Sequence, residues 1–232
     1  MQSNLNHLTY ILNIETATKN CSVSISKNGE TIALKETNTG NYSHAEKLHE
    51  FINDVSKIAQ INLSDLNAVA VSKGPGSYTG LRIGVSSAKG LCFALNIPLI
   101  SVNTLESLAT SISKKSGFII PLLDARRMEV YTSVFEFSGK QLKKVSAVII
   151  DESSFNEFLS KEKVYFLGDG AEKCKQFIKH ENAVFIDDKF PSANEMSKLG
   201  YDKYKKNDIE DVAYFEPFYL KDFIAIKAKK LL

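Results

Sequence analysis

One segment constrains the fold of this chain more than any other: a glycine-rich loop that leaves a buried strand and opens a helix. It reads Ser-Lys-Gly-Pro-Gly-Ser-Tyr-Thr-Gly-Leu-Arg-Ile-Gly over residues 72–84. Gly74 and Gly76 free the backbone for a tight turn. The helix that follows is predicted to end before Pro98, because proline disfavours helical backbone in the residue that precedes it. A strand that leads through a short loop into a helix is typical of α/β folds.

The same loop offers a contact for an anion. Backbone amides at the start of a helix, together with the helix dipole, attract negatively charged groups. Gly74, Gly76 and Ser77 are therefore candidates for a weak nucleotide or anion contact. The segment is not a Walker A loop, because no Gly-Lys-Ser/Thr closes it.

The helix after the loop carries small residues at four-residue spacing. These are Gly80, Gly84 and Ala88, with Ser87 beside them. Glycine inside a helix costs up to about 1 kcal/mol relative to alanine, so two glycines on one face need a reason. A face without side chains lets another backbone approach closely. Two explanations stay open here: docking of a partner protein, or close packing within this chain.

Hydrophobic periodicity extends the α/β pattern along the chain, and the Asn28-Gly29 pair predicts a tight hairpin turn. The expected strands span 8–15, 21–27, 30–37, 66–72, 98–102, 118–123, 128–137, 145–150, 164–167 and 183–187. The expected helices span 43–60 (with a Ser43–Glu46 capping box), 78–95, 104–114, 152–160, 171–179 and 192–205. We expect two closely packed lobes, residues 1–103 and 104–232, the second a looser version of the first with an abbreviated start. Residues 214–232 are expected to hold one strand-like stretch and a short basic end.

Composition limits the classes of function. The net charge of +2 does not predict a nucleic-acid-binding face, and three scattered cysteines argue against a disulfide framework. No signal peptide is apparent, and no apolar run reaches the roughly 18 residues of a membrane span. We therefore expect a cytoplasmic protein that does not contact a membrane.

Three further segments are candidates for chemistry. Glu15 and Thr16 follow the first strand, where actin-like folds hold a nucleotide's metal and phosphate, although a polar strand end is the simpler interpretation. Asp124 precedes Arg126 and Arg127 at the matching place in the second lobe. There it could pair with an arginine and pin a polar turn. Gly168 and Gly170 flank Asp169 between a strand and a helix, a turn that could receive a nucleotide.

Spacing nominates no metal site and no catalytic nucleophile. His44 and His49 share a helix but lie five residues apart, so their side chains project about 140° apart around its axis and cannot share one ion. No elbow motif of the type G-x-S-x-G occurs. We expect neither a cofactor nor a catalytic residue.

Several of these motifs together resemble one family, the TsaB (YeaZ-type) tRNA threonylcarbamoyladenosine biosynthesis proteins, over about residues 9–220. The resemblance lies in segments 11–18, 44–46, 74–84, 124–131, 168–170 and 216–220. It departs at Glu15, where the family more often has Asp, and at Leu48-His49-Glu50, where Leu-Leu-Pro is frequent.

The resemblance implies a two-lobed actin-like (ASKHA, ribonuclease H-like) fold with mixed sheets flanked by helices. It implies a non-catalytic subunit that docks the catalytic subunit TsaD, in the complex that makes N6-threonylcarbamoyladenosine at position 37 of tRNAs reading ANN codons. The ATPase TsaE joins that complex, tRNA is bound through it, and the free protein forms homodimers through a related face. The docking residues implied on the first-lobe helices are Ser43, His44, Lys47, Tyr78, Gly80, Leu81, Gly84, Ser87, Ala88 and Leu91. On this hypothesis Gly84→Leu leaves a folded monomer and abolishes the complex.

Two other functions stay open. The chain could be a stand-alone actin-like nucleotide-dependent kinase or acyltransferase, with ATP bound between the lobes near Glu15, Asp124 and Gly168. It could also be a peptidase, but no nucleophile–base pair supports that activity. Calorimetry with ATP and Mg²⁺ would separate the first alternative from a docking protein.

Overall fold

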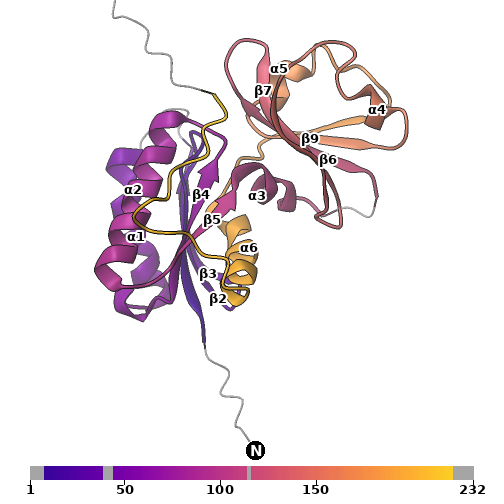
Figure 1. The fold of residues 1–232 in the computed structure, drawn as a ribbon. Helices are drawn as coiled ribbons and strands as arrows, with labels where there is room; N and C mark the ends of the chain where they lie inside the picture. Colours follow the sequence, from indigo (N-terminus) through magenta and orange to yellow (C-terminus); the bar gives the residue numbers. More distant parts are fainter. Residues whose placement is uncertain (1–7, 39–43, 114–115, 222–232) are drawn as a thin grey trace, which may run out of the picture.

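The computed structural model describes residues 8–38, 44–113 and 116–221, which form two lobes that each contain a five-stranded mixed sheet (Figure 1). The first sheet has the order β3-β2-β1-β4-β5. Its strands are β1 (Tyr10–Glu15), β2 (Cys21–Lys27), β3 (Glu30–Thr37), β4 (Ala68–Gly74) and β5 (Leu99–Asn103). β1, β2 and β3 form an antiparallel meander, whereas β1, β4 and β5 run parallel. Asn28 and Gly29 both adopt positive φ in the β2–β3 turn, which confirms the hairpin prediction.

The second sheet repeats this arrangement, because its order β8-β7-β6-β9-β10 matches the first sheet strand for strand. Its strands are β6 (Phe118–Asp124), β7 (Glu129–Glu136), β8 (Gln141–Ile149), β9 (Val164–Leu167) and β10 (Ala183–Ile186). The meander β6-β7-β8 is antiparallel, and β6, β9 and β10 run parallel. The expected abbreviated start of this lobe is therefore wrong. The doubled order is that of the two-lobed actin-like fold.

The helices on the two sheets are unequal. α1 (His44–Ala59) and α2 (Tyr78–Leu95) lie side by side on one face of the first sheet (Figure 1). Leu48 and Val55 of α1 and Val85 of α2 pack there in one buried cluster with residues of β1 and β2. The equivalent α4 (Asn156–Leu159) and α5 (Ala171–Cys174) in the second lobe have four residues each, shorter than predicted. A short 3-10 helix, Leu63–Asp65, precedes β4.

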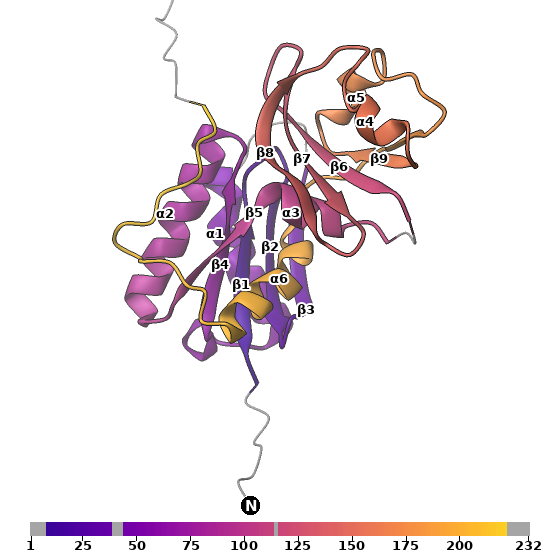
Figure 2. The same cartoon turned by 45° about the vertical axis from the view of Figure 1, so that its right-hand side comes forward.

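The helix that follows the last strand of each sheet packs against the other sheet. α3 (Thr104–Thr110) follows β5, but its Leu105 and Leu108 pack against Ile119 and Leu167 of the second sheet. α6 (Ala193–Lys205) follows β10, but its Met196 packs on the free face of the first sheet. Figure 2 shows α3 at the junction of the lobes and α6 beside β1 and β3.

This exchange corrects the predicted division at residue 103. Residues 104–232 include α6, which covers the first sheet, and residues 206–221, which also return to the first lobe. The strand predicted in the tail is absent from its described part, residues 214–221. An isolated bridge before this part joins Glu210 to Leu99. Ser43 and its capping box lie outside the described residues. None of the described helices is long and apolar enough to cross a membrane.

Candidate functional site

The small-residue face of α2 packs against the turn between β1 and β2. The Thr16 hydroxyl donates a hydrogen bond to the Gly80 carbonyl at 2.8 Å. A Cβ added at Gly80 would lie 2.1 Å from the Thr16 carbonyl oxygen, and one at Gly84 would lie 2.2 Å from Thr16 Oγ1. Of the two explanations left open by the sequence, packing within the chain accounts for both glycines.

This packing corrects the predicted docking residues. Gly80, Leu81, Gly84 and Ala88 are buried by the chain itself and cannot contact a partner. For the same reason, we now expect Gly84→Leu to destabilise the monomer itself, because the larger side chain would overlap Thr16.

His44 is likewise an internal anchor. Its side chain is buried, and Nε2 lies 2.7 Å from the carbonyl oxygen of Thr18, so Nε2 carries the proton and donates. Burial lowers the pKa of this imidazole, while the hydrogen bond to Thr18 opposes that effect. His44 therefore ties the start of α1 to the β1–β2 turn rather than forming a docking surface.

Glu15, at the end of β1, is fully buried beneath the same turn. Its Oε1 accepts hydrogen bonds from the Ala17 amide at 2.6 Å and the Ser72 hydroxyl at 2.7 Å. Burial raises the pKa of this carboxyl to about 7. Neither Glu15 nor Thr16 lines the cleft between the lobes, so the structure does not bring them to a nucleotide site there.

The outward-facing residues of α1 and α2 form a separate surface. Of the predicted docking residues, Lys47, Tyr78, Ser87 and Leu91 keep part of their surface accessible. Ser87 Oγ of α2 lies 3.4 Å from His49 Nε2 of α1, and this contact links the two helices across the surface. We define the α1–α2 outer surface by its accessible residues Lys47, His49, Arg82, Ser86, Ser87, Gly90, Leu91 and Phe93.

Five residues of the α1–α2 outer surface were not among the predicted docking residues, namely His49, Arg82, Ser86, Gly90 and Phe93, and the last two stand out. Gly90 is exposed, and an added Cβ there would meet nothing within 4 Å. Phe93, one turn further along, keeps 85% of its surface accessible. The available signal was a third glycine inside the helix, which falls outside the four-residue repeat of Gly80, Gly84 and Ala88.

A cleft of about 800 Å³ lies between the lobes. Its walls come from the β1–β2 turn, the start of α2, the β6–β7 turn and the C-terminal segment. The lining residues are Ala17, Thr18, Lys19, Asn38, Gly76, Ser77, Tyr78, Thr79, Leu123, Asp124, Ala125, Arg126, Tyr131, Asp169, Phe190, Tyr219, Leu220 and Lys221. The cleft thus brings together Gly76, Ser77 and Asp124 of the predicted anion contacts. Gly74, Gly168 and Gly170 do not line it.

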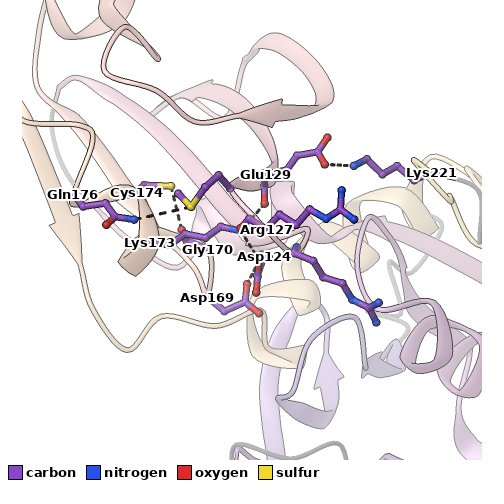
Figure 3. A network of polar contacts seen from close by, with 11 residues as sticks. Asp124, Arg127, Glu129, Asp169, Gly170, Lys173, Cys174, Gln176 and Lys221 are labelled. Carbon is purple, nitrogen blue, oxygen red and sulfur yellow. Dashed lines mark hydrogen bonds and ion pairs between the residues drawn. The ribbon is translucent and has the colours of Figure 1, made fainter. Parts of the chain in front are cut away.

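Asp124 belongs to a polar network at the second-lobe wall of this cleft (Figure 3). Its carboxylate pairs with Lys173 and accepts a hydrogen bond from the Arg126 amide at 2.9 Å. Lys173 also donates to the carbonyls of Arg127 and Glu129 at 2.9 and 2.6 Å. The expected pairing of Asp124 with an arginine side chain is therefore wrong, since a lysine from α5 takes that place.

Asp169 completes the network. Its Oδ1 accepts a hydrogen bond from the Asp124 amide at 2.9 Å. Within the described residues, no group of three or more His, Cys, Asp or Glu side chains is placed to hold a metal ion. The cleft offers hydrogen bonds, charge and aromatic rings.

The sequence is similar to a known family along most of its length. Residues 39–230 match the family model of TsaD, tRNA N6-adenosine threonylcarbamoyltransferase. The TsaB protein of Escherichia coli is 30% identical over 94% of this chain and 96% of its own length. The TsaB protein of Bacillus subtilis is 36% identical over 75% of this chain and 76% of its own.

Solved structures show the same fold. A Pseudomonas aeruginosa protein described as similar to the peptidase YeaZ superposes with a TM-score of 0.81 at 22% identity, covering 92% of this chain and all of that one. YeaZ from the same organism superposes with a TM-score of 0.76 at 23% identity, covering 91% of this chain and all of that one. The sequence matches and the doubled fold agree: the chain belongs to the TsaB (YeaZ-type) family of tRNA threonylcarbamoyladenosine biosynthesis proteins.

Proposed function

We propose that this chain is a non-catalytic scaffold subunit of the complex that transfers a threonylcarbamoyl group to N6 of adenosine 37 in tRNAs reading ANN codons. Its role is to dock the catalytic subunit TsaD. The family to which the chain belongs supports the pathway, and the α1–α2 outer surface supports the docking role. The complex would act in the cytoplasm. There the ATPase TsaE would join it, and tRNA would bind to the complex rather than to this chain alone.

The observation that carries the docking role is Gly90. A glycine in a helix interior costs up to about 1 kcal/mol relative to alanine, and a contact that requires it normally explains it. Thr16 supplies that contact for Gly80 and Gly84, whereas nothing in the described chain approaches Gly90. Close approach of a partner helix is the corresponding reason at an exposed position. The exposed ring of Phe93 beside it offers an anchor of the kind that dominates protein interfaces.

The docking surface therefore moves around α2 from the predicted glycine face to the α1–α2 outer surface. Lys47, Ser87 and Leu91 stay in the proposal, and His49, Arg82, Ser86, Gly90 and Phe93 join them. Among the described residues, two long neighbouring helices occur in the first lobe only, since α4 and α5 of the second lobe have four residues each. A homodimer of the free protein would use the same surface and compete with TsaD.

The decisive experiment compares Gly90→Leu with Lys205→Leu. Both add a leucine to an exposed helical position, but Lys205 lies on α6, across the first sheet from α1 and α2. We expect both variants to fold: Lys205→Leu should melt like the wild type, and Gly90→Leu at the same or a higher temperature, because leucine favours the helix more than glycine does. Gly90→Leu should raise the Kd for TsaD at least tenfold, about 1.4 kcal/mol, by calorimetry or size-exclusion chromatography. Unchanged affinity for Gly90→Leu would exclude the α1–α2 outer surface as the docking site.

A second candidate function is a stand-alone nucleotide-dependent kinase or acyltransferase. The observation in its favour is the interlobe cleft, whose volume suits a small ligand and whose wall includes Ser77 at the start of α2. The burial of Glu15 beneath the turn weighs against it. Calorimetry of the isolated protein with ATP and Mg²⁺ separates the two functions, since a scaffold subunit should give no binding heat at micromolar concentrations.

A further inference from the structure

The C-terminal segment, residues 206–221, forms a strap along the first lobe. After α6 it passes the edge strand β5, where the Glu210 amide donates to the Leu99 carbonyl at 2.8 Å. It then runs beside α2, where Lys89 Nζ donates to the carbonyls of Ala213 and Phe215 at 3.1 and 3.0 Å. Figures 1 and 2 both show the strap following α2 toward the helix N-terminus.

Near its end the strap joins the glycine loop and the first turn of α2. The Phe218 amide donates to the Lys73 carbonyl at 2.7 Å, and the Phe218 carbonyl lies so close to Gly74 that a Cβ there would stand 2.8 Å away. The ring of Tyr219 packs on Tyr78, with centroids 4.9 Å apart. Arg82 donates to the Tyr78 hydroxyl at 2.8 Å, which connects the strap to the α1–α2 outer surface.

The strap then reaches the other lobe. Lys221 forms an ion pair with Glu129, the first residue of β7 (Figure 3). Among the ion pairs of the described residues, this is the one that joins the first-lobe strap to the second lobe, and the other pairs stay within a lobe. Tyr219, Leu220 and Lys221 also form part of the cleft wall. The link therefore lies at the cleft itself.

We propose that the strap is an interlobe latch that sets how far the cleft opens. The backbone crosses between the lobes at Asn103–Thr104 and again between β10 and α6. The strap adds a third, non-covalent link between α2 of one lobe and β7 of the other. Because an exposed ion pair is weak and is screened by salt, this link can open and close without unfolding either lobe.

The test measures the distance between the two lobes in the full chain. Spin labels are attached at Glu30→Cys and Lys140→Cys, which are exposed positions on opposite lobes. The three native thiols should stay unlabelled, because each is buried. Burial raises the pKa of Cys21 to about 12 and those of Cys92 and Cys174 to about 11, which disfavours the reactive thiolate.

We expect Lys221→Glu to shift the interlobe distance distribution to longer values and broaden it. The double variant Lys221→Glu with Glu129→Lys restores the reversed pair and should recover the wild-type distribution. Glu157→Gln, which removes the Lys143–Glu157 pair inside the second lobe, is the control and should change nothing. A wild-type distribution for Lys221→Glu overturns the latch, and so does a shift that the double variant fails to reverse.

A second measurement links the latch to docking and rests on the proposed function. If TsaD binds around Arg82, an opened latch should weaken binding several-fold, and bound TsaD should shift the interlobe distances toward the closed state, because coupling between the two equilibria is reciprocal. Unchanged affinity in Lys221→Glu would contradict this link while leaving the latch itself to the distance measurement. Failure of the wild type to bind TsaD would instead refute the proposed function.

Discussion

At the scale of single residues, Thr16 determines where α2 sits. Its hydroxyl and carbonyl oxygens occupy the space that side chains at positions 84 and 80 would otherwise fill. The same hydroxyl donates to the Gly80 carbonyl, so one threonine both holds the helix and requires its glycines.

Gly84→Ala should therefore destabilise the protein. Overpacking of a close contact costs about 1–3 kcal/mol. Gly90→Ala is the matched control on the same helix; it has open space and should stabilise by up to about 1 kcal/mol. Urea denaturation measures both. Adding Thr16→Ala to Gly84→Ala removes the contacting hydroxyl and should recover part of the loss, whereas strictly additive effects would contradict this explanation.

Glu15 makes stability depend on pH in an unusual direction for a carboxylate. Burial raises its pKa from 4.5 to about 7 in the folded protein, so the folded state holds this proton more tightly than the unfolded state. The contribution of Glu15 is therefore fully present below pH 4.5 and is lost as the pH rises to about 7. Each tenfold change in proton affinity corresponds to about 1.4 kcal/mol.

Glu15→Gln should remove this dependence. Because other carboxyl groups also titrate, the quantity to measure is the difference in unfolding free energy between wild type and variant at several pH values. Relative to the variant, the wild type should lose stability between pH 4.5 and about 7 and then level off. A difference that stays constant over this range would show that Glu15 titrates normally.

At the scale of elements, α2 has a buried glycine face, an accessible face that belongs to the α1–α2 outer surface, and an N-cap that fixes its start. Ser77 is its N-cap, with Oγ accepting from the Gly80 amide at 3.3 Å. Ser77→Ala should cost about 1 kcal/mol in thermal or urea unfolding, because that amide loses its partner. Ser77→Asp keeps an acceptor in place and should cost little; equal losses in the two variants would mean that the cap contributes nothing.

The sequence predicted α2 with the bounds that the structure gives, because the glycine loop precedes its start and Pro98 follows its end. The short helices were less predictable. Four residues are too few to show a helical period. The ranges predicted for α4 and α5 therefore include residues that belong to the flanking loops. β8 begins at Gln141, four residues earlier than expected, because most of its residues are exposed and lack the alternation that marks a half-buried strand.

At the scale of the whole molecule, the exchange of α3 and α6 makes each sheet depend on the other half of the chain. Local patterns predicted both helices but could not show that α6 returns to cover the first sheet, because that depends on contacts between residues far apart in sequence. The site divides in the same way. Asp124 was predicted near the cleft between the lobes and lines it, whereas Glu15 and Gly168, predicted beside it, do not. The contact of Thr16 with Gly84 joins two separate motifs and could not be predicted.

A fragment of residues 8–103 should therefore fail to fold. It lacks α6, and so exposes the face on which Met196 packs against Ile11, Ala70 and Ile100. Fusing residues 190–221 to its C-terminus should restore helical circular dichroism and a cooperative melt. A cooperative melt of the unfused fragment would show that α6 is dispensable to the first sheet.

The position of α6 also determines when the first lobe can finish folding during synthesis. Ninety residues separate Asn103, the end of β5, from Ala193, the start of α6. At translation rates of about 5–20 residues per second, the first sheet waits roughly 5 to 20 seconds with one apolar face uncovered. On the ribosome, the first lobe is thus begun early and completed late, and its open face is a natural place for a chaperone to act.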